Sequence, residues 1–306
     1  GFHVRDEYVG KTGTKRQPGL EESPWRTGRD EWVVAGEPEA SAWWYPANDH
    51  PSDPALLDVA VRVPRMYQAV SIGRLVSRDT GQEPEFDTWR WQTSQPAPTY
   101  ATFLAIGRYS IRESEADGRP AVYAVSEQVP PSDRDRLFAA LERTPTAIRE
   151  LEAVAGPYPY SEIGGVVPAV ELWFAGLETA TRPVYHRHAL LDEEYGDELL
   201  VHELAHMWFG DHVTLLQWND IFTNEAFASW AHWEVVERRG GRSTDAQLDG
   251  TYRMSRRSRD FWRVTMIDPG KEELFGTVYV RGPMALAALD NVMGADSFDA
   301  LIRSWA

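Results

Sequence analysis

The stretch VHELAHMWFGD, residues 201–211, places two histidines four positions apart within the apolar pattern of a helix. Four residues make roughly one helical turn, so His202 and His206 lie on one face of this helix, one above the other. Both imidazoles can then reach a single zinc ion, and Glu203 can reach a water molecule on that ion without binding the ion itself. A chance match to HExxH in a chain with only 8 histidines among 306 residues has odds on the order of one per cent. The stretch therefore predicts a helix that carries a metal site.

A third metal ligand is expected downstream of this helix. Catalytic zinc takes three protein ligands and keeps one position for a water molecule, whose pKa falls to about 7. The segment WNDIFTNEAFASW, residues 218–230, starts a second predicted helix that packs beside the first. Glu225, near the start of this second helix, is the candidate ligand, and Asp220 is its nearest competitor. Because the chain has no cysteine, any metal must be held by His, Asp or Glu.

The composition argues against several classes of partner. The chain has 31 Lys and Arg residues against 47 Asp and Glu, a formal net charge of −16, which disfavours nucleic acids and anionic membrane surfaces. No apolar run approaches the ~20 residues of a membrane-spanning helix, and the first residues do not resemble a targeting segment. The absence of cysteine excludes disulfides and fits a cytoplasmic and an exported protein equally well.

The order of periodic segments predicts an α+β chain in two parts. Residues 32–112 alternate with period two and read as strands, residues 113–120 as a linker or hairpin, and the remainder as short strands followed by helices. Pro145 is expected to kink or split the first long helix. We therefore expect a partial N-terminal β domain over residues 1–112 and a mixed domain over residues 121–306.

Four motifs in this order resemble the M1 family of zinc aminopeptidases. HELAHMWFGD is followed by the glutamate of TNEAFA, with 18 residues between His206 and Glu225. FAGLETATRPVY, residues 174–185, is similar to the family's GAMEN motif, with Glu178 at its glutamate. VYVRG, residues 278–282, resembles the VYEKG segment, and GEPEASAWWYPANDHPSD, residues 36–53, resembles a segment of the family's N-terminal domain.

The resemblance implies a β-sandwich-like N-terminal domain, here incomplete, followed by a thermolysin-like catalytic domain whose last helices are incomplete. It implies one Zn²⁺ per chain, bound by His202, His206 and Glu225, with Glu203 as the general base. The activity that it implies is the removal of N-terminal residues from peptides.

The resemblance also implies roles for three further side chains. Tyr279 takes the position of the family's catalytic tyrosine, which stabilises the oxyanion. Glu178 and Glu37 fall where carboxylates hold the free amine of the substrate, and a slip of two positions would exchange Glu37 with Glu39. The GAMEN-like stretch departs from the family's pattern, because it reads AGLET, with Thr179 in place of asparagine.

Other interpretations remain open at this point. A thermolysin-like endopeptidase has the same metal site and no use for the amine-binding carboxylates, and a zinc-binding or peptide-binding fragment has no turnover at all. Glu178 can also be a solvated loop glutamate, and Tyr279 a half-buried aromatic at the end of a strand. His186 and His188 form an HxH pair that we interpret as loop residues rather than ligands.

Overall fold

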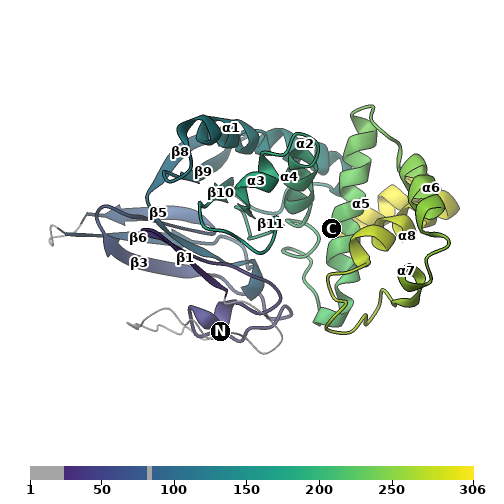
Figure 1. Ribbon diagram of the computed structural model, residues 1–306, viewed down its shortest axis with the longest axis horizontal. Coiled ribbons are helices and arrows are strands. Elements are labelled where there is room, and N and C mark those ends of the chain that lie inside the picture. Colours follow the sequence, from purple (N-terminus) through teal and green to yellow (C-terminus); the bar gives the residue numbers. More distant parts are fainter. Residues whose placement is uncertain (1–23, 81–84) are drawn as a thin grey trace.

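The computed structural model describes residues 24–80 and 85–306, so the first 23 residues of the predicted β domain lie outside the described part. The predicted α+β class is confirmed. Figure 1 shows two small sheets at one end of the molecule, a larger sheet with helices in the middle, and a group of long helices at the other end. None of the helices in the described ranges is long and apolar enough to cross a membrane.

The first part of the chain is built from two antiparallel sheets. One has the order β1-β2-β7-β4, with strands Trp25–Gly28, Glu31–Val34, Leu104–Gly107 and Gln68–Ser71. The other has the order β3-β6-β5, with strands Asp58–Pro64, Phe86–Gln92 and Arg74–Asp79. In β6 the period-two pattern buries Trp89 and Trp91 while Arg90 faces solvent. The indole of Trp91 donates to the Ala69 carbonyl at 2.8 Å, which joins the two sheets.

The second part contains a mixed sheet of five strands in the order β11-β12-β10-β9-β8. These strands are Gly176–Leu177, Val184–Tyr185, Ile163–Val167, Arg119–Ser126 and Tyr109–Ala116. The parallel pair β9 and β10 is joined by helices α1, Pro131–Leu141, and α2, Thr144–Ala155. Pro145 splits the predicted helix in two, because it occupies the first turn of α2, where its missing N–H costs nothing.

Residues 113–120 do not form a linker between the two parts. They form the end of β8, a turn and the start of β9, and both strands belong to the five-stranded sheet. The turn of this hairpin is made by Asp117 and Gly118, an Asp–Gly pair in which both residues have positive φ. Of the two alternatives weighed from the sequence, the structure shows the hairpin.

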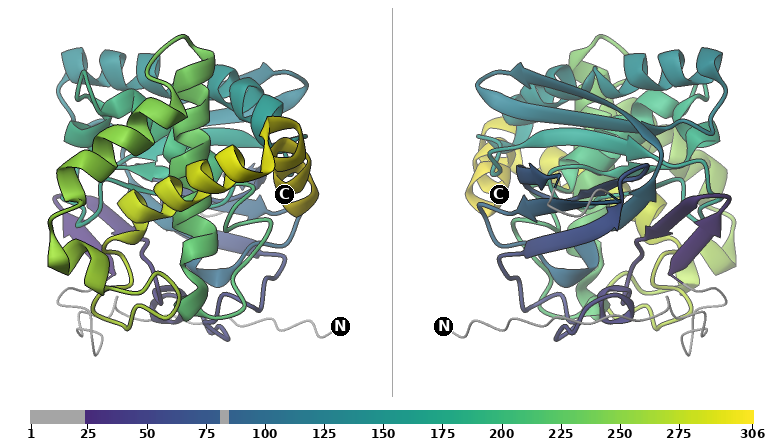
Figure 2. Two further views of the ribbon diagram at one scale, coloured as in Figure 1. Left: turned by 90° about the vertical axis from the view of Figure 1, so that its right-hand side faces the viewer. Right: turned by 90° about the vertical axis from the view of Figure 1, so that its left-hand side faces the viewer.

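The remaining helices follow the sheet. They are α3 (Arg187–Leu190), α4 (Gly196–Ala205), α5 (Phe222–Arg238), α6 (Thr244–Ser255), α7 (Arg259–Arg263), α8 (Val278–Met293) and α9 (Ala295–Trp305). Figure 2 shows α8 crossing the long helix α5. The close approach of α8 depends on Gly282, because a Cβ at this position would lie 2.4 Å from the Cβ of Ala226 on α5.

Two buried charged side chains join the β part to the second part. The fully buried guanidinium of Arg182 donates to the carbonyls of Gly73 at 3.1 Å and Val122 at 3.2 Å, and also to that of Ser71. The buried carboxylate of Glu31 accepts from the backbone N–H groups of Ala169 and Val170. These bonds fix the strand that leads into Glu37 relative to the five-stranded sheet.

Candidate active site and metal centre

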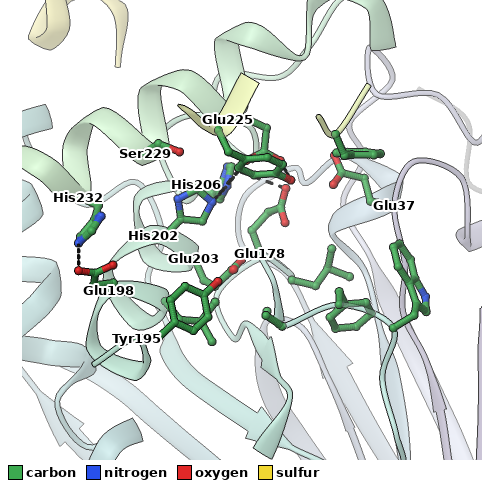
Figure 3. Close-up of a pocket in the computed structure, with 18 residues that line it drawn as sticks. Glu37, Glu178, Tyr195, Glu198, His202, Glu203, His206, Glu225, Ser229 and His232 are labelled. Carbon is green, nitrogen blue, oxygen red and sulfur yellow. Dashed lines mark hydrogen bonds and ion pairs between the residues drawn. The ribbon is translucent and has the colours of Figure 1, made fainter. Parts of the chain in front are cut away.

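A cavity of about 460 Å³ lies between α4, α5, the edge strand β11, the start of α8 and the segment after β2. Figure 3 shows its lining, with His202, His206 and Glu225 near the middle. His202 lies in the last turn of α4, and His206 follows directly after the helix. Glu225 lies in the first turn of α5, which packs against α4. The structure thus brings together the three residues that the sequence nominated as metal ligands.

The spacing of these three side chains fits a zinc ion. The Nε2 atoms of His202 and His206 are 3.2 Å apart, and Glu225 Oε2 is 3.4 Å from each of them. Ligand atoms at zinc-bond lengths in a tetrahedron lie about 3.4 Å from one another. His206 and Glu225 are buried and His202 is partly buried, so the three side chains are largely shielded from solvent.

Hydrogen bonding and charge prepare two of these groups for a metal. His206 Nδ1 lies 2.9 Å from the Phe209 carbonyl, so Nδ1 carries a proton and Nε2 is the ring atom directed at the other two side chains. Burial favours the neutral form of Glu225, but the neighbouring His206 and His202 outweigh it and lower the pKa of Glu225 to about 2. The carboxylate is therefore ionised at neutral pH, as a metal ligand must be.

Glu203 lies beside the cluster without belonging to the group of three. It is 5% exposed, and one of its oxygens lies within 4.8 Å of ligand atoms of both His206 and Glu178. Burial raises the pKa of Glu203 well above its usual range, and the negative charge of Glu178 raises it further. A carboxylate with a raised proton affinity, next to the three predicted metal ligands, is suited to accept and release a proton.

Glu178 and Glu37 line the same cavity from two different parts of the chain. Glu178 directly follows β11, and Glu37 lies three residues after β2, with 3% and 5% exposure. In each, Oε1 is buried without a hydrogen-bond partner. Burial raises the pKa of Glu37 well above its usual range, and repulsion by Glu178 contributes to the shift. Glu39, the alternative that the sequence left open, is exposed and does not line the cavity.

Tyr279 lies in the first turn of α8, so the interpretation as a strand-end aromatic was wrong. Its ring centroid is 6.0 Å from that of His202, and its hydroxyl donates to Glu225 Oε1 at 2.8 Å. The phenol thus lies against the predicted ligands and lines the cavity.

Several polar groups of the site carry no signal in the sequence. Asn224 donates to the hydroxyl of the buried Tyr100 at 2.9 Å, and Tyr100 in turn hydrogen-bonds Glu178. Asn224 and Tyr100 are 124 positions apart in the sequence, so no local sequence pattern predicts their contact. Asn224 therefore supports Glu178 through Tyr100.

Glu198, Ser229 and His232 also line the cavity and were not nominated from the sequence. By contrast, Asp220 does not line the cavity. His186 is 3.0 Å from Glu171, and His188 accepts a bond from Arg187. Within the described ranges, neither histidine belongs to a group of three or more potential metal ligands. The interpretation as a loop residue was wrong for His188, which lies in the short helix α3, while His186 directly precedes this helix.

The comparisons with known proteins agree with this geometry. The sequence profile of the peptidase family M1 domain matches residues 140–306. Aminopeptidase N of Streptomyces lividans is 29% identical over 168 residues, covering 51% of this chain and 19% of that protein. Aminopeptidase M1 of Arabidopsis thaliana is 25% identical over 297 residues, covering 89% of this chain and 32% of that protein. The chain thus spans about a fifth to a third of the length of these relatives.

A solved structure extends the likeness to the whole fold. The crystal structure of a mutant M1 zinc metallopeptidase from Deinococcus radiodurans, bound to a Tyr-Ser-Ala substrate, superposes with a TM-score of 0.81 at 27% identity. The alignment covers 97% of this chain and 66% of that one. Since the family profile also covers more than half of the sequence, from residue 140 to residue 306, the chain belongs to peptidase family M1.

Proposed function

We propose that this protein is a zinc-dependent aminopeptidase that removes residues from the free N-termini of peptides. The observation that carries the proposal is the pair Glu178 and Glu37. Each is buried and each has a carboxylate oxygen without a hydrogen-bond partner, and both carboxylates lie within 4.8 Å of an oxygen of Glu225. Two buried carboxylates that face one another are costly unless a cation binds between them. The protonated α-amine of a peptide, bound next to the three predicted metal ligands, is such a cation.

His202, His206 and Glu225 would hold the zinc ion, as their spacing and the ionised state of Glu225 support. When bound, zinc supplies a Lewis acid that polarises the scissile carbonyl and makes water more acidic. Its presence in M1 metallopeptidases of the same fold supports this assignment.

The side chains around these three ligands would transfer the proton, stabilise the oxyanion and bind the substrate amine. Glu203 takes the proton of the attacking water and passes it to the leaving amine, for which its buried position and raised pKa suit it. Tyr279 would turn from its bond with Glu225 and donate a hydrogen bond from its hydroxyl to the carbonyl oxygen as negative charge develops there. Glu178 and Glu37 hold the ammonium group, so that only the first peptide bond reaches Glu203.

The edge strand β11 supports this placement of the substrate. It pairs with β12 on one side, while its residues Gly176 and Leu177 line the cavity. A free strand edge of this kind can bind an extended peptide through its backbone groups. Glu178 directly follows this strand. It then lies next to the N-terminal amine of a peptide that is paired with the strand.

A comparison of free and blocked substrates tests the proposal. The purified chain, loaded with zinc, should hydrolyse an aminoacyl amide with a free amine and lose this activity with a chelator. The same amide with an acetylated amine should be a very poor substrate. Equal rates on the free and the acetylated amide would indicate an endopeptidase. Zinc binding without turnover of either substrate would indicate a binding fragment.

A further inference from the structure

The end of the cavity opposite Glu37 is also acidic. In Figure 3, Glu37 and Glu178 lie on one side of the two histidines, and Glu198 and His232 lie on the other. Glu198 stands one turn before His202 on α4 and lines the cavity, with 51% of its side chain exposed. It can therefore meet a bound molecule at the solvent side of the site.

No basic residue in the described ranges neutralises Glu198. The Nε2 atom of His232 lies 4.0 Å from Glu198 Oε1. Burial lowers the pKa of His232 to about 4, and His202 contributes to the shift, so the imidazole is neutral at neutral pH. The arginines that come near, Arg143 and Arg239, form ion pairs with the preceding residue, Asp197. Within residues 24–80 and 85–306, Glu198 forms no ion pair with lysine or arginine.

The direction of the substrate follows from the proposed function, on which this inference rests. The substrate amine lies at Glu178 and Glu37, and the first peptide bond lies at the histidine cluster. An extended residue spans roughly 3.3–3.6 Å, so the chain that leaves the cluster continues past His202 towards Glu198. The second residue of the peptide is the one that meets this end of the cavity.

We propose that Glu198 makes this end of the cavity a subsite for a basic second residue, so that peptides with lysine or arginine after the scissile bond are preferred substrates. The lining also suits the aliphatic stem of such a side chain. Tyr195, which is 44% exposed, and the buried Leu199 lie beside Glu198 and offer apolar surface. A long basic side chain buries its stem on such surface while its charged end reaches the carboxylate.

Three peptide amides that differ only in the second residue test the subsite: Leu-Lys amide, Leu-norleucine amide and Leu-Glu amide. Norleucine has the stem of lysine without its charge. We expect kcat/KM of the wild type to be about fivefold higher for lysine than for norleucine, the size of effect that a partly exposed ion pair gives. The glutamate peptide should be the poorest of the three. In Glu198→Gln the kcat/KM of the lysine peptide should fall to that of the norleucine peptide, so that the lysine preference disappears.

Glu193→Gln is the matched control, because Glu193 is an exposed glutamate of the same segment that does not line the cavity. It should keep the wild-type preference. A binding measurement shows whether the preference arises in substrate binding rather than in the rate of cleavage. In a Glu203→Gln background, calorimetry should show that the lysine peptide binds more tightly than the norleucine peptide. Adding Glu198→Gln should abolish this difference in affinity.

Failure of the subsite and failure of the proposed function give different results. Turnover of all three peptides without a charge preference, or a lysine preference that persists in Glu198→Gln, would overturn the subsite alone. No turnover of any of the three peptides by the zinc-loaded wild type would overturn the aminopeptidase and the subsite with it.

Discussion

The carboxylate of Glu203 occupies the space in which a side chain at Gly176 would stand. A Cβ built on Gly176 would lie 2.4 Å from Glu203 Oε1 and 2.6 Å from its Cδ. The edge strand β11 therefore approaches the proposed base closely only because residue 176 has no side chain. In the GAMEN-like stretch, Ala175 and Gly176 stand where the family's motif has glycine and then alanine. The glycine at position 176 leaves room for the side chain of Glu203.

Gly176→Ala should displace Glu203 and lower kcat by a factor of about 10 to 100, approaching the contribution of a general base. Zinc content should be unchanged, because the three proposed ligands are not touched. Gly250→Ala is the control, since the three atoms nearest to its Cβ would all belong to the flexible end of the exposed Arg242 side chain. A variant with full kcat would show that the contact does not position Glu203.

His202→Ala and His206→Ala should lose zinc and activity together, because each removes one of three ligands. Zinc per chain after dialysis, measured by atomic absorption, checks this outcome. His212→Ala, at an exposed position outside the cavity, should keep its zinc. Stoichiometric zinc in either ligand variant would contradict the assignment.

Glu203→Gln should retain zinc while kcat falls by a factor of ~10² or more, because the amide cannot accept the proton of the attacking water. Metal content and kcat must be measured on the same preparation. Loss of the metal in this variant would make Glu203 a ligand and overturn its proposed role.

Glu178→Gln should lower kcat/KM by roughly one to two decades on substrates with a free amine, since a charge-assisted hydrogen bond contributes about 1.5–3 kcal/mol. The difference in kcat/KM between free and acetylated aminoacyl amides should become smaller for the same reason. Glu37→Gln should act in the same direction, and Glu39→Gln should not, because Glu39 does not line the cavity. An unchanged preference in both Glu178→Gln and Glu37→Gln would favour the endopeptidase.

Glu234→Gln should stabilise the protein at pH 8 and not at pH 4.5. Burial on α5 raises the pKa of Glu234 to about 7, despite the opposing charge of Arg238, whereas in the unfolded chain this carboxyl has its ordinary pKa of 4.5. The folded state therefore holds this proton more tightly, and its stability falls as pH rises from about 4.5 to 7. Thermal unfolding at both pH values checks this, with an expected rise in Tm of about 2–4 °C at pH 8 only.

The sequence by itself determined those features that depend on neighbours one helical turn apart or on two-residue alternation. His202 and His206 share a helix face because a helix repeats every 3.6 residues, and Pro145 ends one helix and starts another because it lacks an N–H. The motifs that place Glu178 and Glu225 are likewise short and local. The α+β class followed from the same periodicities.

Only the tertiary structure decided which groups meet across long stretches of chain. It selected Glu37 rather than Glu39, because the segment after β2 buries one and exposes the other. It joined Asn224 to Tyr100, 124 positions away, and set Glu198 beside His232 without a basic partner. These contacts arise from packing between elements whose order in sequence does not fix their distance in space, and packing of this kind leaves no periodic trace in the sequence.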